Sequence, residues 1–396
     1  MEQSSILSFL KKPGSSRPGP SRTENTRPGE PYQRHNTNRP KHNMSNHNRA
    51  PNRRRNMGLK LVADETKLVL PSILSKVPSK FDAEWATLET MYHQDGSTLP
   101  KERCPGVRKP CIIQVLNMDS FDAAVQLEPN HTVRQHCSME KTDMDAEDEK
   151  PAIAPKSDID TPIKDVATSE DAQGKLQDPE VKKQPGKAKE SMRVRPVAVL
   201  NLASERSPGG GWQKGALAQE ECLCYRSSLY LTLDREQYYP IPALAAIYSP
   251  NVVIIRNSMT DGHELLDSIH PMDLPALSVI SVAALRQPPL SDDGKTFKNI
   301  GARAHTKNNV RLILRVAARH GHTKLVLGAL GCGVYSNPPG EVAHCFLEVL
   351  HEPEFQGGWF EKIVFAVLDN IRGPDGGKDG TGNFGVFYRV LHGQVV

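Results

Sequence analysis

Apolar and polar residues follow one another along this chain in blocks that predict strands alternating with helices. The apolar runs are of strand length and nearly continuous, which is typical of strands buried on both faces of a sheet. Their alternation with helical segments predicts a largely parallel sheet covered by helices on both faces. The apolar runs are residues 110–117, 197–202, 252–256, 277–282, 324–330 and 362–368, and the helical segments are residues 120–127, 222–233, 308–320 and 338–350.

Two long segments lack this pattern. Residues 1–58 are rich in Arg, Asn, Pro and Ser, and residues 134–192 are rich in Asp, Glu, Lys, Pro and Ser. Such segments bury too little apolar surface to offset the entropy lost on ordering, so we predict that both are disordered. The sequence therefore predicts one α/β domain, residues 59–396, interrupted by a disordered insert at 134–192 and preceded by a disordered arm.

The charge of the chain is concentrated in this arm. Residues 1–60 contain thirteen Lys or Arg and three Asp or Glu, whereas the whole chain has a net charge of only +4. A basic arm can contact nucleic acid electrostatically, and Arg53-Arg54-Arg55 with Lys60 has the pattern of a nuclear import signal. The alternative is a solvating tail without a dedicated partner.

The remaining composition excludes several classes of protein. No apolar run approaches the roughly 18 residues of a membrane span, and the first residues lack the apolar core of a signal peptide, so we expect an intracellular protein without membrane contact. The seven cysteines form no Cys-x-x-Cys pair, only Cys222-x-Cys224, which predicts reduced thiols. The histidines of the arm have no cysteine partners, so we predict neither a metal nor another cofactor.

The most specific pattern is a glycine triplet, Gly209–Gly211, shortly before Gln219-Glu220-Glu221. Residues without Cβ let a ligand lie against backbone N–H groups, as a diphosphate or a sugar requires. Two adjacent glutamates in a closed site raise the pKa of one of them, which can then act as an acid near neutral pH. Cleavage of a glycosidic bond needs such an acid. The alternative is an ordinary glycine turn followed by a polar helix start.

A second glycine loop, Gly331–Tyr335, follows the apolar run at 324–330. We expect Asn337 to cap the next helix and Pro338 to lie in its first turn, so that the loop amides and the helix N-terminus face an anion such as a diphosphate. The loop lacks the Gly-Lys-Ser/Thr ending of kinases and the spacing of dinucleotide-binding motifs. The alternative is a simple tight turn.

These motifs together resemble the signature of poly(ADP-ribose) glycohydrolases of the microbial, bacterial type. The matching residues are Asn201–Ser204, Pro208–Gly211 and Gln219–Glu221, and the loop at 328–338 is similar to the family's diphosphate loop. The resemblance covers about residues 81–396, without the insert and the arm. It implies a macrodomain-like three-layer α/β/α fold with a mixed, largely parallel sheet. It also implies metal-independent hydrolysis of the ribosyl-ribose bonds of poly(ADP-ribose), releasing ADP-ribose mainly from chain ends.

Two other functions remain open at this stage. A catalytically silent macrodomain would bind ADP-ribose on modified proteins without cleaving it, and it would have no need of the glutamate pair. A nucleic-acid-binding scaffold would use the basic arm, with the α/β domain only structural, and its affinity would fall steeply with salt.

The resemblance also implies roles for individual residues. Glu221 would be the catalytic acid and base, and Glu220 would hold ribose hydroxyls. From the residues alone, the late aromatics Phe384 and Phe387 are equally typical of a core and of a stacking platform. The implied substrate-binding residues are Asn201 and Gly209, Gly210 and Gly211 for the terminal ribose and diphosphate, Gln219 for positioning the pair, Gly331, Cys332, Gly333, Val334 and Tyr335 for the diphosphate, Asp119 for adenine, and Phe387, or otherwise Phe384, for the terminal ribose.

The first residues resemble the box with which proteins bind the sliding clamp PCNA. Gln3, Ile6, Phe9 and Leu10 have its spacing, with Leu10 in place of the second aromatic. A polar tail has little structural reason to cluster these side chains, although a chance apolar start is the alternative. Together with the basic arm, the segment predicts a nuclear, otherwise cytoplasmic, protein that is recruited to replication or repair sites.

Overall fold

Seven strands form one mixed sheet in the part of the chain that the computed structural model describes, residues 56–91, 98–144 and 195–396. The strand order is β1-β4-β5-β3-β6-β7-β2. β4 runs antiparallel to both of its neighbours, β1 and β5, and the other neighbouring pairs are parallel. The strands are β1 (Thr87–Thr90), β2 (Gln114–Leu116), β3 (Ala198–Ala203), β4 (Ala245–Val253), β5 (Ala276–Ala283), β6 (Lys324–Leu327) and β7 (Lys362–Ala366).

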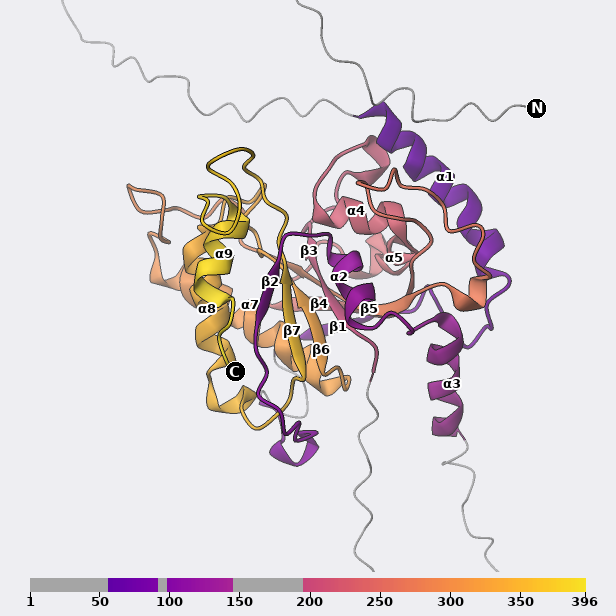
Figure 1. Cartoon of the computed structure of the whole chain (residues 1–396), viewed down its shortest axis with the longest axis horizontal. Helices are drawn as coiled ribbons and strands as arrows, with labels where there is room; N and C mark the ends of the chain where they lie inside the picture. The colour runs from indigo at the N-terminus through magenta and orange to yellow at the C-terminus, as the bar shows by residue number, and fades with distance from the viewer. Residues whose placement is uncertain (1–55, 92–97, 145–194) are drawn as a thin grey trace, which may run out of the picture.

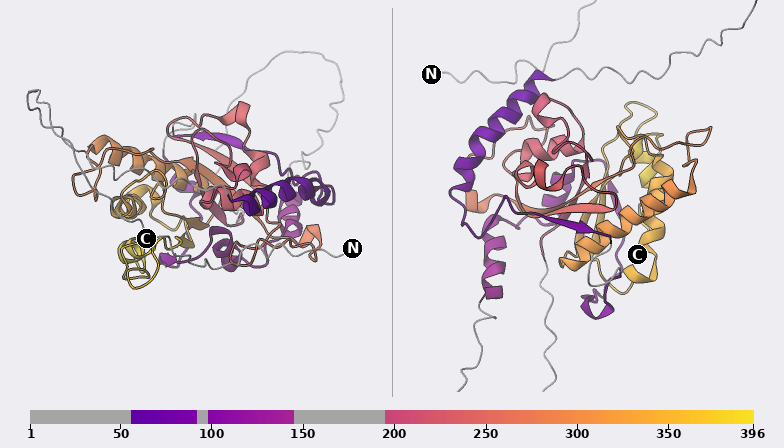
Figure 2. Two further views of the ribbon diagram at one scale, coloured as in Figure 1. Left: turned by 90° about the horizontal axis from the view of Figure 1, so that it is seen from above. Right: turned by 180° about the vertical axis from the view of Figure 1, so that it is seen from behind.

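Helices cover both faces of this sheet (Figure 1). Alternate residues of β3 face opposite layers: Ala198 and Leu200 belong to one core cluster, and Val199 belongs to the other. Figure 2 shows α1 and α7 on opposite sides of the molecule. The expected three-layer α/β/α architecture is thus confirmed. One layer contains α7 (Ile300–Arg319), α8 (Pro339–Leu350) and α9 (Asn383–Leu391), and the other contains α1 (Met57–Leu74), α2 (Ser120–Leu127), α4 (Gln219–Arg226) and α5 (Leu229–Thr232).

Helix α1 is an element that the sequence pattern did not predict. Asn56 caps it by accepting hydrogen bonds from the backbone amides of its first turn. The hydroxyl of Thr66 donates to the Tyr225 carbonyl oxygen at 2.8 Å, and Glu65 forms an ion pair with the buried Arg256, also at 2.8 Å. The helix is therefore stabilised by tertiary contacts with the region of α4, and the ordered domain begins before residue 59.

The predicted insert also begins later than expected. Helix α3 (Val133–Met144) occupies its first residues, and Val133, His136 and Cys137 are buried there. Three buried side chains supply the apolar contact that the overall composition of the segment does not suggest. Residues 145–194 lie outside the described residues, as do residues 1–55 with the clamp-binding segment and the import signal.

Other element boundaries differ from the prediction. Strand β4 begins at Ala245 rather than at residue 252. The polar Ser249-Pro250-Asn251 stretch, which breaks the apolar run in the sequence, is buried within the strand at an irregularity in its register with β5. Helix α7 begins at Ile300 rather than at residue 308, with Asn299 as its cap. The predicted helix at 222–233 is divided into α4 and α5 at Ser227 and Ser228. There the Ser227 hydroxyl donates to the Leu223 carbonyl in α4, and the Ser228 hydroxyl accepts from the Val253 amide in β4.

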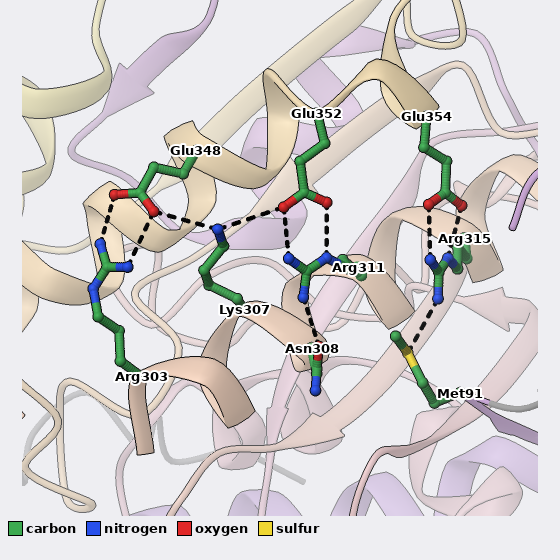
Figure 3. A network of polar contacts seen from close by, with 9 residues as sticks. All are labelled: Met91, Arg303, Lys307, Asn308, Arg311, Arg315, Glu348, Glu352 and Glu354. Carbon is green, nitrogen blue, oxygen red and sulfur yellow. Dashed lines mark hydrogen bonds and ion pairs between the residues drawn. The ribbon is translucent and has the colours of Figure 1, made fainter. Parts of the chain in front are cut away.

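A row of ion pairs joins α7 to the end of α8 and the turn that follows (Figure 3). Arg311 and Arg315 each bind one carboxylate through two nitrogens, those of Glu352 and Glu354, at 2.6–2.7 Å. The side chain of Arg315 is 6% exposed and that of Arg303, at the other end of the row, is 31% exposed. Buried bidentate pairs of this kind fix the orientation of two helices.

Candidate active site

Both glycine loops lie at the same edge of the sheet. β3 and β6 are parallel neighbours, so the loops that follow them leave from their carboxyl ends at one place. The hydroxyl of Tyr335, in the second loop, accepts a hydrogen bond from the Glu205 amide at 3.3 Å. The two segments singled out in the sequence therefore meet, and α4, which carries the glutamates, packs beside β3 (Figure 1).

The glutamate pair occupies the first turn of α4 and is buried. One carboxylate oxygen of each residue is fixed by the backbone: Glu220 Oε2 accepts from the Ser204 amide at 2.9 Å, and Glu221 Oε1 accepts from the Gly211 amide at 3.0 Å. The second oxygens, Glu220 Oε1 and Glu221 Oε2, have no hydrogen-bond partner among the described residues. Buried polar atoms are rarely left unpaired, so these oxygens are available to a ligand.

The middle glycine of the triplet packs directly against the two carboxylates, and the first packs against Trp212. Gly210 has a φ of +63°, and a Cβ at this position would lie 2.5 Å from Glu221 Oε1 and 2.9 Å from Glu220 Oε2. At Gly209, with a φ of +65°, a Cβ would meet the Trp212 ring at 2.6 Å. Only glycine permits both this backbone conformation and this contact. The loop thus packs directly against the two carboxyl groups.

The electrostatics of the pair are dominated by burial. Burial raises the pKa of Glu220 to about 8, the amide of Ser204 acts in the opposite direction, and the charge of Glu221 raises it further. Burial thus favours the protonated form of Glu220. The sequence predicted a raised pKa for one of the two residues, and Glu220 has one. The resemblance assigns the acid role to its neighbour, Glu221.

Asn201 and Gln219 have different surroundings. Asn201, on β3, is fully buried; its Nδ2 donates to the Ser281 hydroxyl at 3.0 Å, and its Oδ1 has no partner among the described residues. The Gln219 amide is already engaged on both sides, because it accepts from the Leu202 amide at 2.9 Å and donates to the Leu200 carbonyl at 2.7 Å. Asn201 can therefore meet a ligand, whereas Gln219 holds α4 against β3.

In the second loop, the expected helix cap is wrong. Helix α8 begins at Pro339, its cap position is Pro338, and no side chain caps it. The Asn337 Nδ2 instead donates to the Leu285 carbonyl at 2.7 Å and to the Gly331 carbonyl at 3.2 Å, which closes the loop on itself. A short polar side chain before a proline can serve either purpose, and the neighbouring carbonyls decide between them.

The other residues of this loop differ in their exposure to solvent. Cys332 is buried, Tyr335 is half-buried, and Val334 is exposed. A Cβ at Gly333 would meet no atom within 4 Å, so open space lies above this backbone. The backbone from Gly331 to Tyr335 is therefore accessible to a ligand at Gly333 and Val334.

Asp119 already has partners in the structure. Its carboxylate caps α2 by accepting from the Phe121 amide at 2.8 Å, and it forms an ion pair with Arg226, at the end of α4. Arg226 also binds Asp122 at 2.6 Å. The pair joins α2 to α4, and the predicted adenine contact of Asp119 stays a prediction. No local pattern marks Arg226, because its partners lie more than 100 positions away along the chain.

The two late aromatics are both buried on α9 and belong to the same core cluster. Phe387 is completely buried and packs against Phe365, with ring centroids 5.9 Å apart. Phe384 is 9% exposed and lies in the first turn of α9, next to Asn383, whose side chain donates to the Cys332 carbonyl at 3.4 Å. Phe384 is thus the nearer of the two in sequence to this contact with the second glycine loop, and the ribose contact of either ring stays a prediction.

A further residue at this site was missed in the sequence. The hydroxyl of Tyr239 is buried and has no hydrogen-bond partner among the described residues. Burial raises the pKa of Tyr239, and the charge of Glu220 raises it further. Nothing in the local sequence distinguishes this tyrosine from Tyr238, whose hydroxyl binds the Ala86 carbonyl at 2.6 Å.

Metal and membrane features can be assessed only for the described residues. Within them, no three His, Cys, Asp or Glu side chains gather in a way that could hold a metal ion. No helix in the same part of the chain combines the length and the apolar character that a membrane span requires.

Comparison with known proteins relates this site to a family. Residues 82–257 match the family model of the microbial-type PARG catalytic domain. The glutamate pair and the glycine triplet lie inside this segment, and the second glycine loop lies beyond it. A search of the curated proteins found no match.

Solved structures of poly(ADP-ribose) glycohydrolases resemble the whole domain. The enzyme from Thermomonospora curvata has 23% identity and a TM-score of 0.55, with 84% of this chain and 99% of that chain covered. Its complex with the inhibitor ADP-HPD gives a TM-score of 0.53 at the same identity and coverage. The enzyme from Deinococcus radiodurans in complex with ADP-ribose has 26% identity and a TM-score of 0.49, with 81% and 97% covered.

The shared fold extends over nearly the entire length of the T. curvata enzyme. The match over residues 82–257 supports a poly(ADP-ribose) glycohydrolase, which is a glycosidase, and the structural likeness supports the mixed α/β fold of that enzyme.

Proposed function

We propose that this chain hydrolyses the ribosyl-ribose bonds of poly(ADP-ribose) with Glu220 and Glu221 as its catalytic pair. One observation carries the proposal: two buried carboxyl groups pack against a glycine loop, and each has one oxygen fixed by a backbone amide and one oxygen that no other described residue bonds. A protein that only binds ADP-ribose has no need to keep two carboxyl groups buried side by side, because their burial is costly.

In this mechanism Glu221 acts as acid and base. A proton held by the pair passes to the 2′ oxygen of the leaving unit as the bond from that oxygen to the ribosyl anomeric carbon breaks. The carboxylate that remains stabilises the positive charge developing on the ribosyl ring. Water then adds to the anomeric carbon and gives a proton to Glu221, which restores the pair.

Substrate placement follows from the unpaired groups. Glu220 Oε1 and Asn201 Oδ1 are buried oxygens without hydrogen-bond partners in the described part of the chain, and ribose hydroxyls can donate to both. The open backbone at Gly333 and Val334 suits the diphosphate. Phe384, at the start of α9, takes the ribose-ordering role in place of Phe387. The proposal includes release mainly from chain ends, which only the family resemblance implies. The size distribution of the products tests this part of the proposal.

The test uses purified full-length protein and labelled poly(ADP-ribose), with products separated by chromatography. Wild type should release ADP-ribose, and Glu221→Gln should lose about 10²–10⁴-fold of the rate, the usual contribution of an acid-base group. Glu264→Gln makes the same change at an exposed position and should retain the wild-type rate. A Glu221→Gln enzyme with wild-type activity would refute the assignment.

The same assay separates the alternatives. Binding of the polymer by wild type without release of ADP-ribose would support a silent ADP-ribose-binding domain. Release from mono-ADP-ribosylated protein but not from the polymer would show that the polymer is the wrong substrate. Binding that depends on nucleic acid, falls with salt and survives removal of residues after Lys60 would support the scaffold function.

Recruitment by the sliding clamp is a separate proposal. It rests on Gln3, Ile6, Phe9 and Leu10, which lie outside the described residues. A peptide of residues 1–20 should capture the clamp, and a peptide with Ile6→Ala and Phe9→Ala should not. Equal recovery by both peptides would exclude this role. The nuclear location stays a prediction, and the bacterial origin of the similar proteins argues against it.

A further inference from the structure

An open cavity is lined by residues that follow β3 and precede the first glycine loop, together with residues of α6 (Arg235–Tyr238) and of the segment after it. It is lined by Glu205, Arg206, Arg235, Tyr239, Pro240 and Ile241. Glu205 directly follows Ser204, whose amide holds the Glu220 carboxylate. The Ile241 amide donates to the Glu205 carbonyl at 2.8 Å, so the two walls of the cavity are tied together. The cavity therefore begins one residue away from the catalytic pair.

The charge of the lining is positive. Arg206 forms an ion pair with Glu205 at 2.8 Å and is otherwise exposed, its side chain being 74% accessible. Arg235 is exposed and has no ion pair among the described residues. Two guanidinium groups and one carboxylate leave one net positive charge and a set of free N–H donors. Guanidinium groups bind phosphate in a planar, bidentate manner.

Tyr239 connects this charged wall with the glutamates. Its hydroxyl is buried and unpaired among the described residues, and the charges of Glu220 and Arg235 both act on it. Because burial raises the pKa of Tyr239, the hydroxyl keeps its proton and can donate a hydrogen bond. Tyr239 therefore lines the same cavity as the two arginines and is close enough to Glu220 for its charge to act on the hydroxyl.

The inference rests on the proposed function and names a part of its substrate. The bond to be cleaved joins the terminal ribose to the 2′ oxygen of the next unit, and that unit carries its own diphosphate. We propose that the cavity binds this next unit on the leaving side of the bond, with Arg206 and Arg235 on its diphosphate and Tyr239 donating to its ribose. The cavity then determines the preference for polymer over a single ADP-ribose group.

Two substrates with the same terminal ADP-ribose test this assignment. One is poly(ADP-ribose), and the other is ADP-ribose with a nitrophenyl group on the anomeric oxygen, which has no diphosphate beyond the bond. In the double variant Arg206→Ala/Arg235→Ala, KM for the polymer should rise about tenfold, the equivalent of 1.4 kcal/mol. KM for the nitrophenyl substrate should stay within about twofold of wild type, because the same constant makes that less than 0.5 kcal/mol.

Controls distinguish the cavity from general effects. The double variant Arg103→Ala/Arg108→Ala removes the same charge from exposed positions outside the cavity, and it should leave both KM values unchanged. Tyr239→Phe keeps the ring and removes only the hydroxyl, so it should raise KM for the polymer alone. An equal rise for both substrates, or no rise for the polymer, would overturn the inference. Wild type that cleaves neither substrate would refute the proposed function instead.

Discussion

Replacing Gly210 with alanine should disable the enzyme without unfolding it. The new methyl group would lie 2.5 Å from Glu221 Oε1 and 2.9 Å from Glu220 Oε2, and both distances are too short for a non-bonded contact between carbon and oxygen. The backbone at a φ of +63° would cost alanine about 1–2 kcal/mol by itself. The side chains must then move, because backbone hydrogen bonds hold the glycine loop: the Gly210 amide donates to the Ser207 carbonyl at 2.8 Å, and the Ala216 amide donates to the Gly211 carbonyl at 3.2 Å.

The expected loss of activity follows from this displacement. A shift of about 1 Å in a catalytic group costs about 100-fold in rate. We therefore expect kcat for poly(ADP-ribose) to fall by about two orders of magnitude, and the free energy of unfolding to fall by only about 1–2 kcal/mol. The assay is ADP-ribose release at saturating polymer, paired with chemical denaturation of each protein.

A matched glycine separates the two effects. Gly294 has a φ of +70°, and a Cβ there would meet no atom within 4 Å. Gly294→Ala should therefore show the same loss of stability and wild-type kcat. If Gly210→Ala keeps kcat within about threefold of wild type, less than 1 kcal/mol by the usual conversion, the packing of the loop on the carboxyls does not matter for catalysis and the reasoning is refuted.

Three further predictions follow from the same structure. Burial raises the pKa of Glu220 from 4.5 to about 8, so the stability that its proton contributes is present below pH 4.5 and is lost as the pH rises to 8. The unfolding free energy should therefore decline from pH 5 to 8 in the wild type, and Glu220→Gln should remove this part of the decline. Equal slopes of unfolding free energy against pH in the two proteins would contradict the prediction. Arg315→Ala should lower the unfolding free energy by about 3 kcal/mol, because it leaves the buried Glu354 carboxylate without its cation. Arg303→Ala, at the more exposed end of the ion-pair row, should lower it by at most about 1 kcal/mol. Equal losses in chemical denaturation would contradict the role of burial. Phe384→Ala should lower kcat/KM for the polymer about fivefold, because it loses a ring contact worth about 1 kcal/mol. Phe387→Ala should instead lower the unfolding free energy by about 3–5 kcal/mol, because the ring is completely buried. The opposite pattern would support Phe387 as the ribose contact.

Local sequence determined the elements of this protein and the chemistry they carry. The near-continuous apolar runs specify buried strands, because side chains on both faces must be covered. The glutamate pair can be recognised because Glu220 and Glu221 are adjacent in the sequence at the start of a helix. Glycines that follow strands mark loops that a ligand can approach. These features depend on residues close together in the chain, so the sequence alone predicts them.

Tertiary structure decided which of these features act together. The two glycine loops meet only because β3 and β6 are neighbours, although more than 100 residues separate them. Helix α1 is held against the domain by contacts of Thr66 and Glu65 with Tyr225 and Arg256, which lie far along the chain. Phe387 and Phe384 are equivalent in sequence, and the packing of α9 decides that the first is 0% exposed and the second 9% exposed. Burial and long-range pairing set these outcomes, and neither property is encoded within a local window.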